Sequence, residues 1–379
     1  MFFTTLSKSI AAKRIKNREI SQNCHRNFAV CGTLILLYPF FAVLAIVFLL
    51  LFPASYDKFV LLPLPAGTER IIPTQVRIIN KKRGDLMERA RTDLALEARN
   101  EYMEKYAHRH EGEADGIEFS ERSENGVKIS EIEISSEEGE RAVGRAMGKY
   151  VTLEFGDITA ADYAAFSSLC TLCARELGAL THGAKSALIC GIGNARMSAD
   201  ELGPRTLEHV LATRALKNRA PEIFEKSGFC EISAVAAGVG ADTGFCAADM
   251  IRAAVKTAKP DVVIAIDALA ARESTRLCKT VQICTSGISP GSGVGNARAR
   301  LDEKSVGAPV ISLGVPTVVD AATLVRDASG TEEGAKKFAG LFVCPADIDA
   351  QSAKLARLLG FAVNLALHKG YPIEEMMLG

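Results

Sequence analysis

Two aspartates stand where apolar segments of the chain stop, and their positions suggest chemistry. Asp200 follows the strand-like segment Ala187–Ile192, and Asp267 follows Val262–Ile266. A carboxylate at the end of a buried strand loses solvation free energy, so it is expected to have a compensating partner or a function. Two carboxylates held close together cannot both ionise cheaply, so they share a proton and can act as an acid–base pair. We predict that Asp200 and Asp267 are catalytic.

Each aspartate also has a plainer interpretation. Asp200 could simply cap the helix that follows it. Gly191 and Gly193 weigh against that alternative, because they open the backbone beside the carboxylate as close approach of a ligand would need. Asp267 comes too soon after its strand to lie in a surface loop, and small alanines follow it.

The elements that must position these residues alternate along the chain. From Tyr150 onward, short apolar strands alternate with amphipathic helices, which predicts an α/β fold of three layers, a mostly parallel sheet with helices on both faces. Working residues of such sheets collect at the carboxyl ends of the strands. The expected strands are Val151–Phe155, Ala187–Ile192, Ile232–Ala237, Val262–Ile266, Val281–Cys284 and Val310–Leu313. The expected helices are Ala161–Leu180, Asp200–Leu216, Thr243–Lys259, Val318–Ala328 and Asp347–His368.

Charge is unevenly distributed. The first 86 residues carry 12 basic and 4 acidic side chains, and the remaining 293 carry 33 basic and 41 acidic ones. Residues 87–379 are therefore acidic overall and poorly suited to bind nucleic acid, so we expect no direct nucleic-acid partner. Within this region, Glu111–Glu140 is acidic and punctuated by glycine, and it contains a strand candidate, VKISEIEIS. We expect this segment to be an exposed flap or partly mobile loop.

Cysteine and histidine usage gives no sign of a metal or cofactor. The ten cysteines lack the spacing of a disulfide framework and indicate a reducing compartment. Cys170 and Cys173 form a CxxC, but they fall on an apolar helical stripe and are expected to be buried. The six histidines lie in different elements, so we predict neither a metal site nor a cofactor.

The N-terminal part of the chain conflicts with the expectation that the rest lies in a reducing compartment. Phe28–Phe52 is uncharged and long enough to cross a bilayer, and basic residues precede it, so it would export everything that follows. Pro53–Leu86 resembles a linker.

A glycine-rich loop, Ser289–Arg300, offers a binding surface. It lacks the Gly-Lys-Ser/Thr ending of a phosphate-binding loop, so a peptide backbone or an acidic side chain suits it better. A plain solvent loop is the alternative. Asp320 lies near a helix start, where capping is its expected role. The candidate substrate-binding residues of the loop are Gly293, Gly295, Arg298 and Arg300.

Several long segments, in order along the chain, resemble the germination protease family of spore-forming bacteria from about Arg91 to the C-terminus. They are RTDLALEAR, YVTLE, GIGN with ADELGP, IAIDALAAR, GISPGSGVGNAR, GVPTVVDA and NLALH. The resemblance implies an atypical aspartic endopeptidase that degrades small acid-soluble spore proteins during germination. It also implies a zymogen, a homotetramer and a fold related to hydrogenase-maturation peptidases.

The family's two functional aspartates fall on Asp200 and Asp267. A local departure is Met197–Ala199, where the family has Val-Thr-Pro before the aspartate, and residues 1–86 have no counterpart in the family. The expected reaction is hydrolysis by a water that one carboxylate activates while the other protonates the carbonyl oxygen and the leaving amine.

The family cuts after an acidic residue that an apolar one follows. Asp93 and Leu94 match this pattern, so we expect self-cleavage between them, with residues 87–93 as the pro-segment and 94–379 as the peptidase domain. Arg298 and Arg300 are the candidate cations for the acidic residue.

Location decides how the N-terminal part is interpreted. A protease of spore proteins must be cytoplasmic, in the spore core, so we expect translation to start at Met87. Lys81–Leu86 can be encoded by a purine run that resembles a ribosome-binding site. The alternative is a zymogen anchored in the membrane through residues 28–52. Two other functions stay open, a metal-dependent maturation-type peptidase and a membrane-anchored binding protein.

Overall fold

The structure is a computed structural model that describes residues 92–106, 115–294 and 299–372. All of these belong to the compact unit Lys81–Gly379. The apolar segment Phe28–Phe52, the linker and the proposed start at Met87 lie outside the described residues. Among the residues that are described, no helix has the length and apolar character that crossing a membrane requires.

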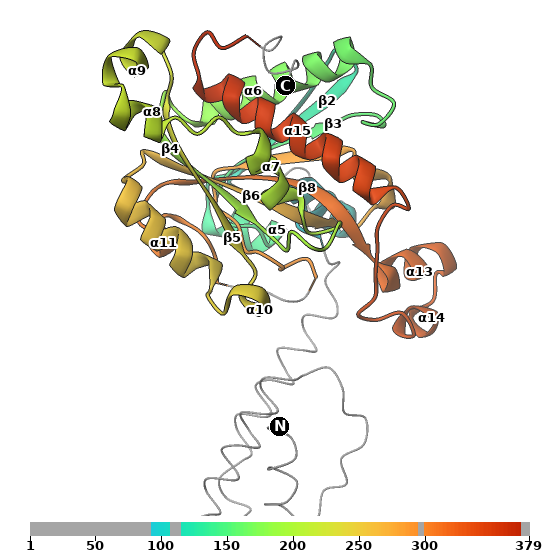
Figure 1. Cartoon of the computed structure of the whole chain (residues 1–379). Coiled ribbons are helices and arrows are strands. Elements are labelled where there is room, and N and C mark those ends of the chain that lie inside the picture. Colours follow the sequence, from blue (N-terminus) through green and yellow to red (C-terminus); the bar gives the residue numbers. More distant parts are fainter. Residues whose placement is uncertain (1–91, 107–114, 295–298, 373–379) are drawn as a thin grey trace, which may run out of the picture. The chain divides into compact units, whose positions relative to one another are not determined.

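A nine-stranded sheet forms the centre of the described part of the chain (Figure 1). Four neighbouring strands, β5, β4, β6 and β8, run parallel, and the sheet continues from β8 through β7, β3, β2 and β1 in antiparallel pairs. In sheet order the strands are β1 (Ile117–Glu124), β2 (Val127–Ile134), β3 (Gly148–Glu154), β7 (Thr280–Cys284), β8 (Val310–Asp320), β6 (Val262–Ala271), β4 (Ser186–Ile192) and β5 (Glu231–Gly238), with β9 (Phe342–Val343) paired to β8.

Helices cover both faces of this sheet, which confirms the predicted α/β class (Figure 1). The sequence predicts a mostly parallel sheet, but the sheet is mixed, with its parallel part confined to four strands. The helices are α4 (Ala95–Tyr106), α5 (Glu137–Val143), α6 (Tyr163–Leu180), α7 (Leu202–Thr206), α8 (Arg214–Arg219), α9 (Pro221–Ser227), α10 (Gly240–Thr243), α11 (Ala247–Ala258), α12 (Glu303–Val306), α13 (Ala321–Ser329), α14 (Glu332–Lys336) and α15 (Ile348–Leu367).

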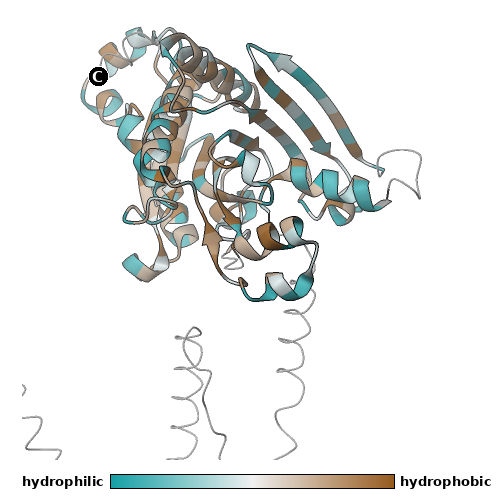
Figure 2. Ribbon diagram, turned by 90° about the vertical axis from the view of Figure 1, so that its right-hand side faces the viewer, coloured by the Kyte–Doolittle hydropathy of each residue, from teal (hydrophilic) through white to brown (hydrophobic). Residues whose placement is uncertain are grey.

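Alternation along the parallel strands divides the core between the two faces. Ile189 and Ile264 pack in the cluster formed with α6 and α15, whereas Leu188 and Val263 pack in the cluster formed with α11. Because successive side chains of a strand point to opposite faces, a strand covered on both faces must be apolar throughout. Figure 2 shows these hydrophobic stretches in brown within the sheet and on the inner faces of the helices.

The CxxC of α6 is part of this core. Cys170 and Cys173 are both fully buried among apolar side chains, as the helical stripe predicts. Burial raises the pKa of the Cys170 thiol to about 12 and that of Cys173 further still. Both thiols are therefore protonated at neutral pH and serve as packing groups.

Several expected elements differ from the observed ones. β6 and β8 extend beyond Ile266 and Leu313, because each continues as the other's parallel partner. The expected helix Asp200–Leu216 is broken into α7, a 3₁₀ turn and α8. The sequence predicts that the acidic segment is a flap that contains one strand. The expected strand at 127–135 is β2, but β1 and the start of α5 are also ordered there, and isoleucines are buried on the inner face of the two edge strands.

Candidate active site

Asp200 closes a tight loop that leaves the end of β4. Gly193 in that loop has φ +118°, and a Cβ there would lie 2.0 Å from the Asp200 carbonyl oxygen, so the position requires glycine. The Asp200 carboxylate accepts a hydrogen bond from the backbone N–H of Asn194 at 2.8 Å. The N-cap of α7 is Glu201, so capping α7 does not account for Asp200.

Asp267 lies inside β6 and is 3% exposed. It is opposite Gly314 of β8, and the backbone N–H of Ala268 donates to its Oδ1 at 3.0 Å. β4 pairs with β6 as far as Ile266. Asp267 is therefore the first residue of β6 beyond its pairing with β4.

A close backbone contact connects the two aspartates. Gly203 of α7 lies so near the ends of both strands that a Cβ there would be 2.3 Å from the carbonyl oxygen of Ile192 and 2.4 Å from that of Ile266. Asp200 is three residues before Gly203, and Asp267 directly follows Ile266. Both residues thus lie near one junction, where α7 packs against the carboxyl end of β4 and the middle of β6.

The loop that carries Asp200 is also fastened to β8. The hydroxyl of Thr317, which is fully buried, donates to the carbonyl oxygen of Ala199 at 2.6 Å. Paired acids at the carboxyl edge of a parallel sheet can exchange protons with a water and a carbonyl group. The catalytic role of Asp200 and Asp267 stays a prediction, which this arrangement suits.

Asp93, the residue before the predicted cleavage, is bound to β6 and to the glycine-rich loop. Its backbone N–H donates to the carbonyl oxygen of Ala270 at 2.7 Å. Its carboxylate accepts hydrogen bonds from the backbone N–H of Ala270 at 2.9 Å and from the Ser292 hydroxyl at 2.6 Å. The chain thus supplies its own acidic residue to the edge of the sheet that carries Asp267.

Gln282 of β7 holds the backbone on both sides of Leu94. Its side-chain amide donates to the carbonyl oxygen of Asp93 at 3.1 Å and accepts from the N–H of Ala95 at 2.7 Å. The Leu94 side chain is fully buried in a cluster with β6 and β8. The bond predicted to be cut is therefore fixed on both sides.

Strand register relates Gln282 to Asp267. Both residues pair with Gly314 of β8, from β7 and β6 respectively. Directly paired residues project to the same face, and neighbouring strands are about 4.8 Å apart, so the Cα atoms of Gln282 and Asp267 are about 10 Å apart in one row. Gly314 itself has no side chain, and the Leu269 side chain fills the space over it.

Glu97 fastens the next turn of the chain. Its buried carboxylate accepts hydrogen bonds from the Thr92 hydroxyl and from the backbone N–H groups of Arg272 (2.7 Å) and Glu273 (3.0 Å), and Arg276 lies 3.4 Å away. Burial raises the pKa of Glu97, an effect that the hydrogen bonds and the Arg276 charge only partly oppose.

The predicted binding residues of the glycine-rich loop fall into three groups. Gly293 lies against Asp93, since a Cβ at this glycine would be 2.3 Å from the Asp93 carboxylate. Arg300 instead donates to the carbonyl oxygen of Ser286 and pairs with Asp302 at 3.4 Å. Arg298 and Gly295 lie outside the described residues. As predicted, Asp320 caps a helix, accepting from the Thr323 N–H at the start of α13.

Sequence reasoning missed Gln282 and Ser292. One signal was available for Gln282, which is the polar residue inside the apolar strand TVQIC and is buried. A buried amide needs hydrogen-bond partners, so its position implied a contact. Ser292 carried no such signal, because serine is ordinary in a glycine-rich loop.

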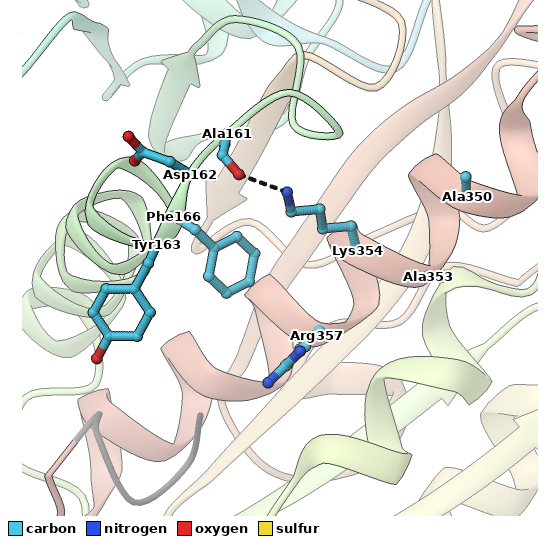
Figure 3. A pocket seen from close by; sticks show the side chains of 8 residues that line it. All are labelled: Ala161, Asp162, Tyr163, Phe166, Ala350, Ala353, Lys354 and Arg357. Carbon is cyan, nitrogen blue, oxygen red and sulfur yellow. Dashed lines mark hydrogen bonds between the residues drawn. The ribbon is translucent and has the colours of Figure 1, made fainter. Parts of the chain in front are cut away.

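Other features of the described residues do not join this site. A pocket of about 470 Å³ between α6 and α15 is lined by Tyr163, Phe166, Lys354 and Arg357 among others (Figure 3), and includes none of the predicted site residues. Lys354 is occupied there, donating to the carbonyl oxygen of Ala161 at 2.8 Å. Within residues 92–106, 115–294 and 299–372, no cluster of three or more His, Cys, Asp or Glu could hold a metal ion.

Comparison with known proteins gives a consistent set of relatives. The family model described as germination protease matches residues 95–330. A germination protease of Clostridium tetani is 34% identical over 320 residues, covering 76% of this chain and 98% of that protein. One of Caldanaerobacter subterraneus is 36% identical over 76% of this chain and 96% of its own length. One of Priestia megaterium is 41% identical over 62% of this chain and 65% of its own.

Among solved structures, the [NiFe] hydrogenase maturation protease HycI of Thermococcus kodakarensis is similar to part of the chain. The match covers 50% of this chain and 98% of that one, with a TM-score of 0.30 and 16% sequence identity.

The backbone contact at Gly203 leads to a stability prediction. Gly203→Ala should lower the free energy of unfolding by about 1–3 kcal/mol, because its Cβ would displace two strand ends. Gly178→Ala in α6 is the matched control, since its Cβ would be 3.8 Å from the nearest atom, and alanine favours helix by about 0.5–1 kcal/mol. Urea unfolding of both variants measures the difference. Equal stabilities would contradict the close contact.

Glu97 should make stability depend on pH. Because burial raises its pKa in the folded state, its contribution is greatest at low pH and is lost as pH rises through the folded-state value. The Glu97→Gln variant lacks this titration. We expect unfolding free energies from urea titrations to shift in favour of the variant as pH rises from about 4 to 7. A difference that stays constant over this range would show that Glu97 does not titrate as proposed.

Proposed function

The chain belongs to the germination protease family, and we propose that it is the aspartic-type endopeptidase that begins the degradation of small acid-soluble spore proteins. A peptidase role in spore germination follows from the family itself. The mechanism, the substrates and the self-processing are the proposal. The observation that carries it is the junction at Gly203, near which Asp200 and Asp267 both lie.

The proposed reaction is direct hydrolysis by water. The ionised member of the aspartate pair takes a proton from a water as its oxygen attacks the scissile carbonyl carbon. The protonated member donates to the carbonyl oxygen and, as the tetrahedral intermediate collapses, a proton passes to the leaving amine. The proton is shared by the pair, so the apparent pKa values belong to the dyad. No covalent intermediate forms.

The contacts of Asp93 support synthesis as a zymogen. Asp93, an acidic residue followed by a buried leucine, is hydrogen-bonded to Ala270 of β6, three residues beyond Asp267 on the same strand. A segment held in this way occupies the space that a substrate would need. We propose that the precursor cuts itself between Asp93 and Leu94, and that residues 87–93 are the pro-segment.

Location, assembly and partners belong to the same proposal. The enzyme would act in the cytoplasm of the spore core on small acid-soluble spore proteins, as a homotetramer. We further propose that translation starts at Met87, so that the apolar segment Phe28–Phe52 is not part of the working enzyme.

Neutralising either aspartate should stop the reaction. Asp200→Asn and Asp267→Asn should each lower cleavage of a recombinant small acid-soluble spore protein by about 10²- to 10⁴-fold, because asparagine keeps the shape but cannot exchange the proton. The double variant should lose little more, since the two residues act as a unit. Mass spectrometry of the products measures the rates.

Asp320→Asn is the matched control for this experiment. Asp320 also ends a neighbouring strand, but it caps α13, and asparagine caps as well as aspartate. This variant should cleave normally. Near-normal turnover by Asp267→Asn would contradict the dyad.

The ends of the native protein should reveal both the start and the processing. N-terminal sequencing and intact-mass measurement should find a precursor that begins at Met87 and a mature form that begins at Leu94. A form of the full 379-residue mass in the membrane fraction would refute the internal start. A mature N-terminus other than Leu94 would refute the cleavage site.

A further inference from the structure

The carboxylate of Asp93 is held at both of its oxygens. Ser292 donates its hydroxyl hydrogen to Oδ1 at 2.6 Å, and the backbone N–H of Ala270 donates to Oδ2 at 2.9 Å. The two donors come from different elements, the glycine-rich loop and β6. Hydrogen bonds to an ionised acceptor are short and strong, and two of them at fixed positions select for a carboxylate.

Gly293 forms a wall of the same site. A Cβ at this position would lie 2.3 Å from Asp93 Oδ2 and 2.6 Å from the Ala270 Cβ. Gly293 is not among the described glycines with positive φ, so a left-handed backbone is not the reason for glycine at this position. The small size of glycine is therefore what the site needs, and a methyl group would fill the space of the carboxylate.

The backbone beside this carboxylate is bound as a substrate backbone would be. The Asp93 N–H donates to the Ala270 carbonyl oxygen, and Gln282 contacts the Asp93 carbonyl oxygen and the Ala95 N–H. The first of these contacts uses the part of β6 beyond its pairing with β4, and the other two use β7. Main-chain hydrogen bonds to an open strand, with a pocket for a side chain, are a common mode of peptide recognition.

We propose that Ser292, Gly293 and the Ala270 N–H form the subsite that recognises the acidic residue before the scissile bond, and that Gln282 positions the carbonyl of that residue. Asp93 fills this subsite in the precursor, and a substrate aspartate fills it after processing. This inference rests on the proposed function, because it treats the Asp93 segment as a substrate in place.

Neutral donors make the subsite specific in a testable way. An asparagine in place of the aspartate carries no charge, and its NH₂ group cannot accept a hydrogen bond, so it can satisfy only one donor as an acceptor. A peptide with aspartate should therefore bind at least about ten times more tightly than the same peptide with asparagine.

Peptide binding tests the subsite without requiring catalysis. The probe is a fluorescent peptide with the sequence of residues 89–98, and the protein is the full chain with Asp93→Ala to weaken its own segment and Asp200→Asn to prevent cleavage. We expect saturable binding by fluorescence anisotropy. Adding Ser292→Ala should weaken binding of the aspartate peptide about 10-fold and binding of the asparagine peptide much less. Adding Gly293→Ala should abolish binding of the aspartate peptide.

Ser289→Ala is the matched control, since Ser289 lies in the same loop but is not among the described partners of Asp93. It should leave both affinities unchanged. Equal affinity for the two peptides, an equal loss of both in Ser292→Ala, or no saturable binding would overturn the subsite.

Cleavage of the same peptides by the chain without substitutions separates this inference from the proposed function. If the chain binds the aspartate peptide selectively but never cuts it, the proposed proteolysis fails and the subsite stands. If the chain cuts the aspartate and asparagine peptides equally well, the proteolysis stands and the subsite fails.

Discussion

An unequal pairing of strands underlies the whole site. β4 pairs with β6 as far as Ile266, while β6 continues beside β8 to Ala271. The backbone groups of this last stretch need partners, because buried N–H and C=O groups are costly when unpaired. The Asp93 backbone and carboxylate supply them at Ala270, and the Glu97 carboxylate supplies them just after β6 ends. The N-terminal segment completes an edge that β4 leaves open.

If the chain is made as a precursor, as we propose, the same constraint would relate that precursor to the processed enzyme. The stretch of β6 that the precursor covers with its own chain would become an open edge once that chain is cut and withdrawn. The donors at Ala270 and Ser292 would then lack the Asp93 carboxylate, and a substrate with the same chemistry could restore their hydrogen bonds. Inhibition in the precursor and recognition in the mature enzyme would use one set of groups, as we propose.

The parallel and antiparallel halves of the sheet hold different parts of the candidate site. The parallel half supplies the strand ends near which Asp200 and Asp267 lie, and the close approach of α7 at Gly203 fixes their common junction. The antiparallel half supplies support from the other side. Gln282 of β7 holds the backbone around Leu94, and Arg145, which precedes β3, donates to the Thr92 carbonyl oxygen. A wholly parallel sheet would have offered no such second support.

Local patterns in the sequence determined the α/β class, the buried CxxC and the capping role of Asp320. Each depends on neighbours a few residues away, which periodicity and residue type report directly. The tertiary structure alone decided the length of β6, the break at α7, and the clasp of Asp93 by Ala270, Gln282 and Ser292. Those contacts join residues more than 170 positions apart. These contacts depend on strand register and on the path of the chain across the sheet. No local pattern of side chains encodes which distant groups will meet.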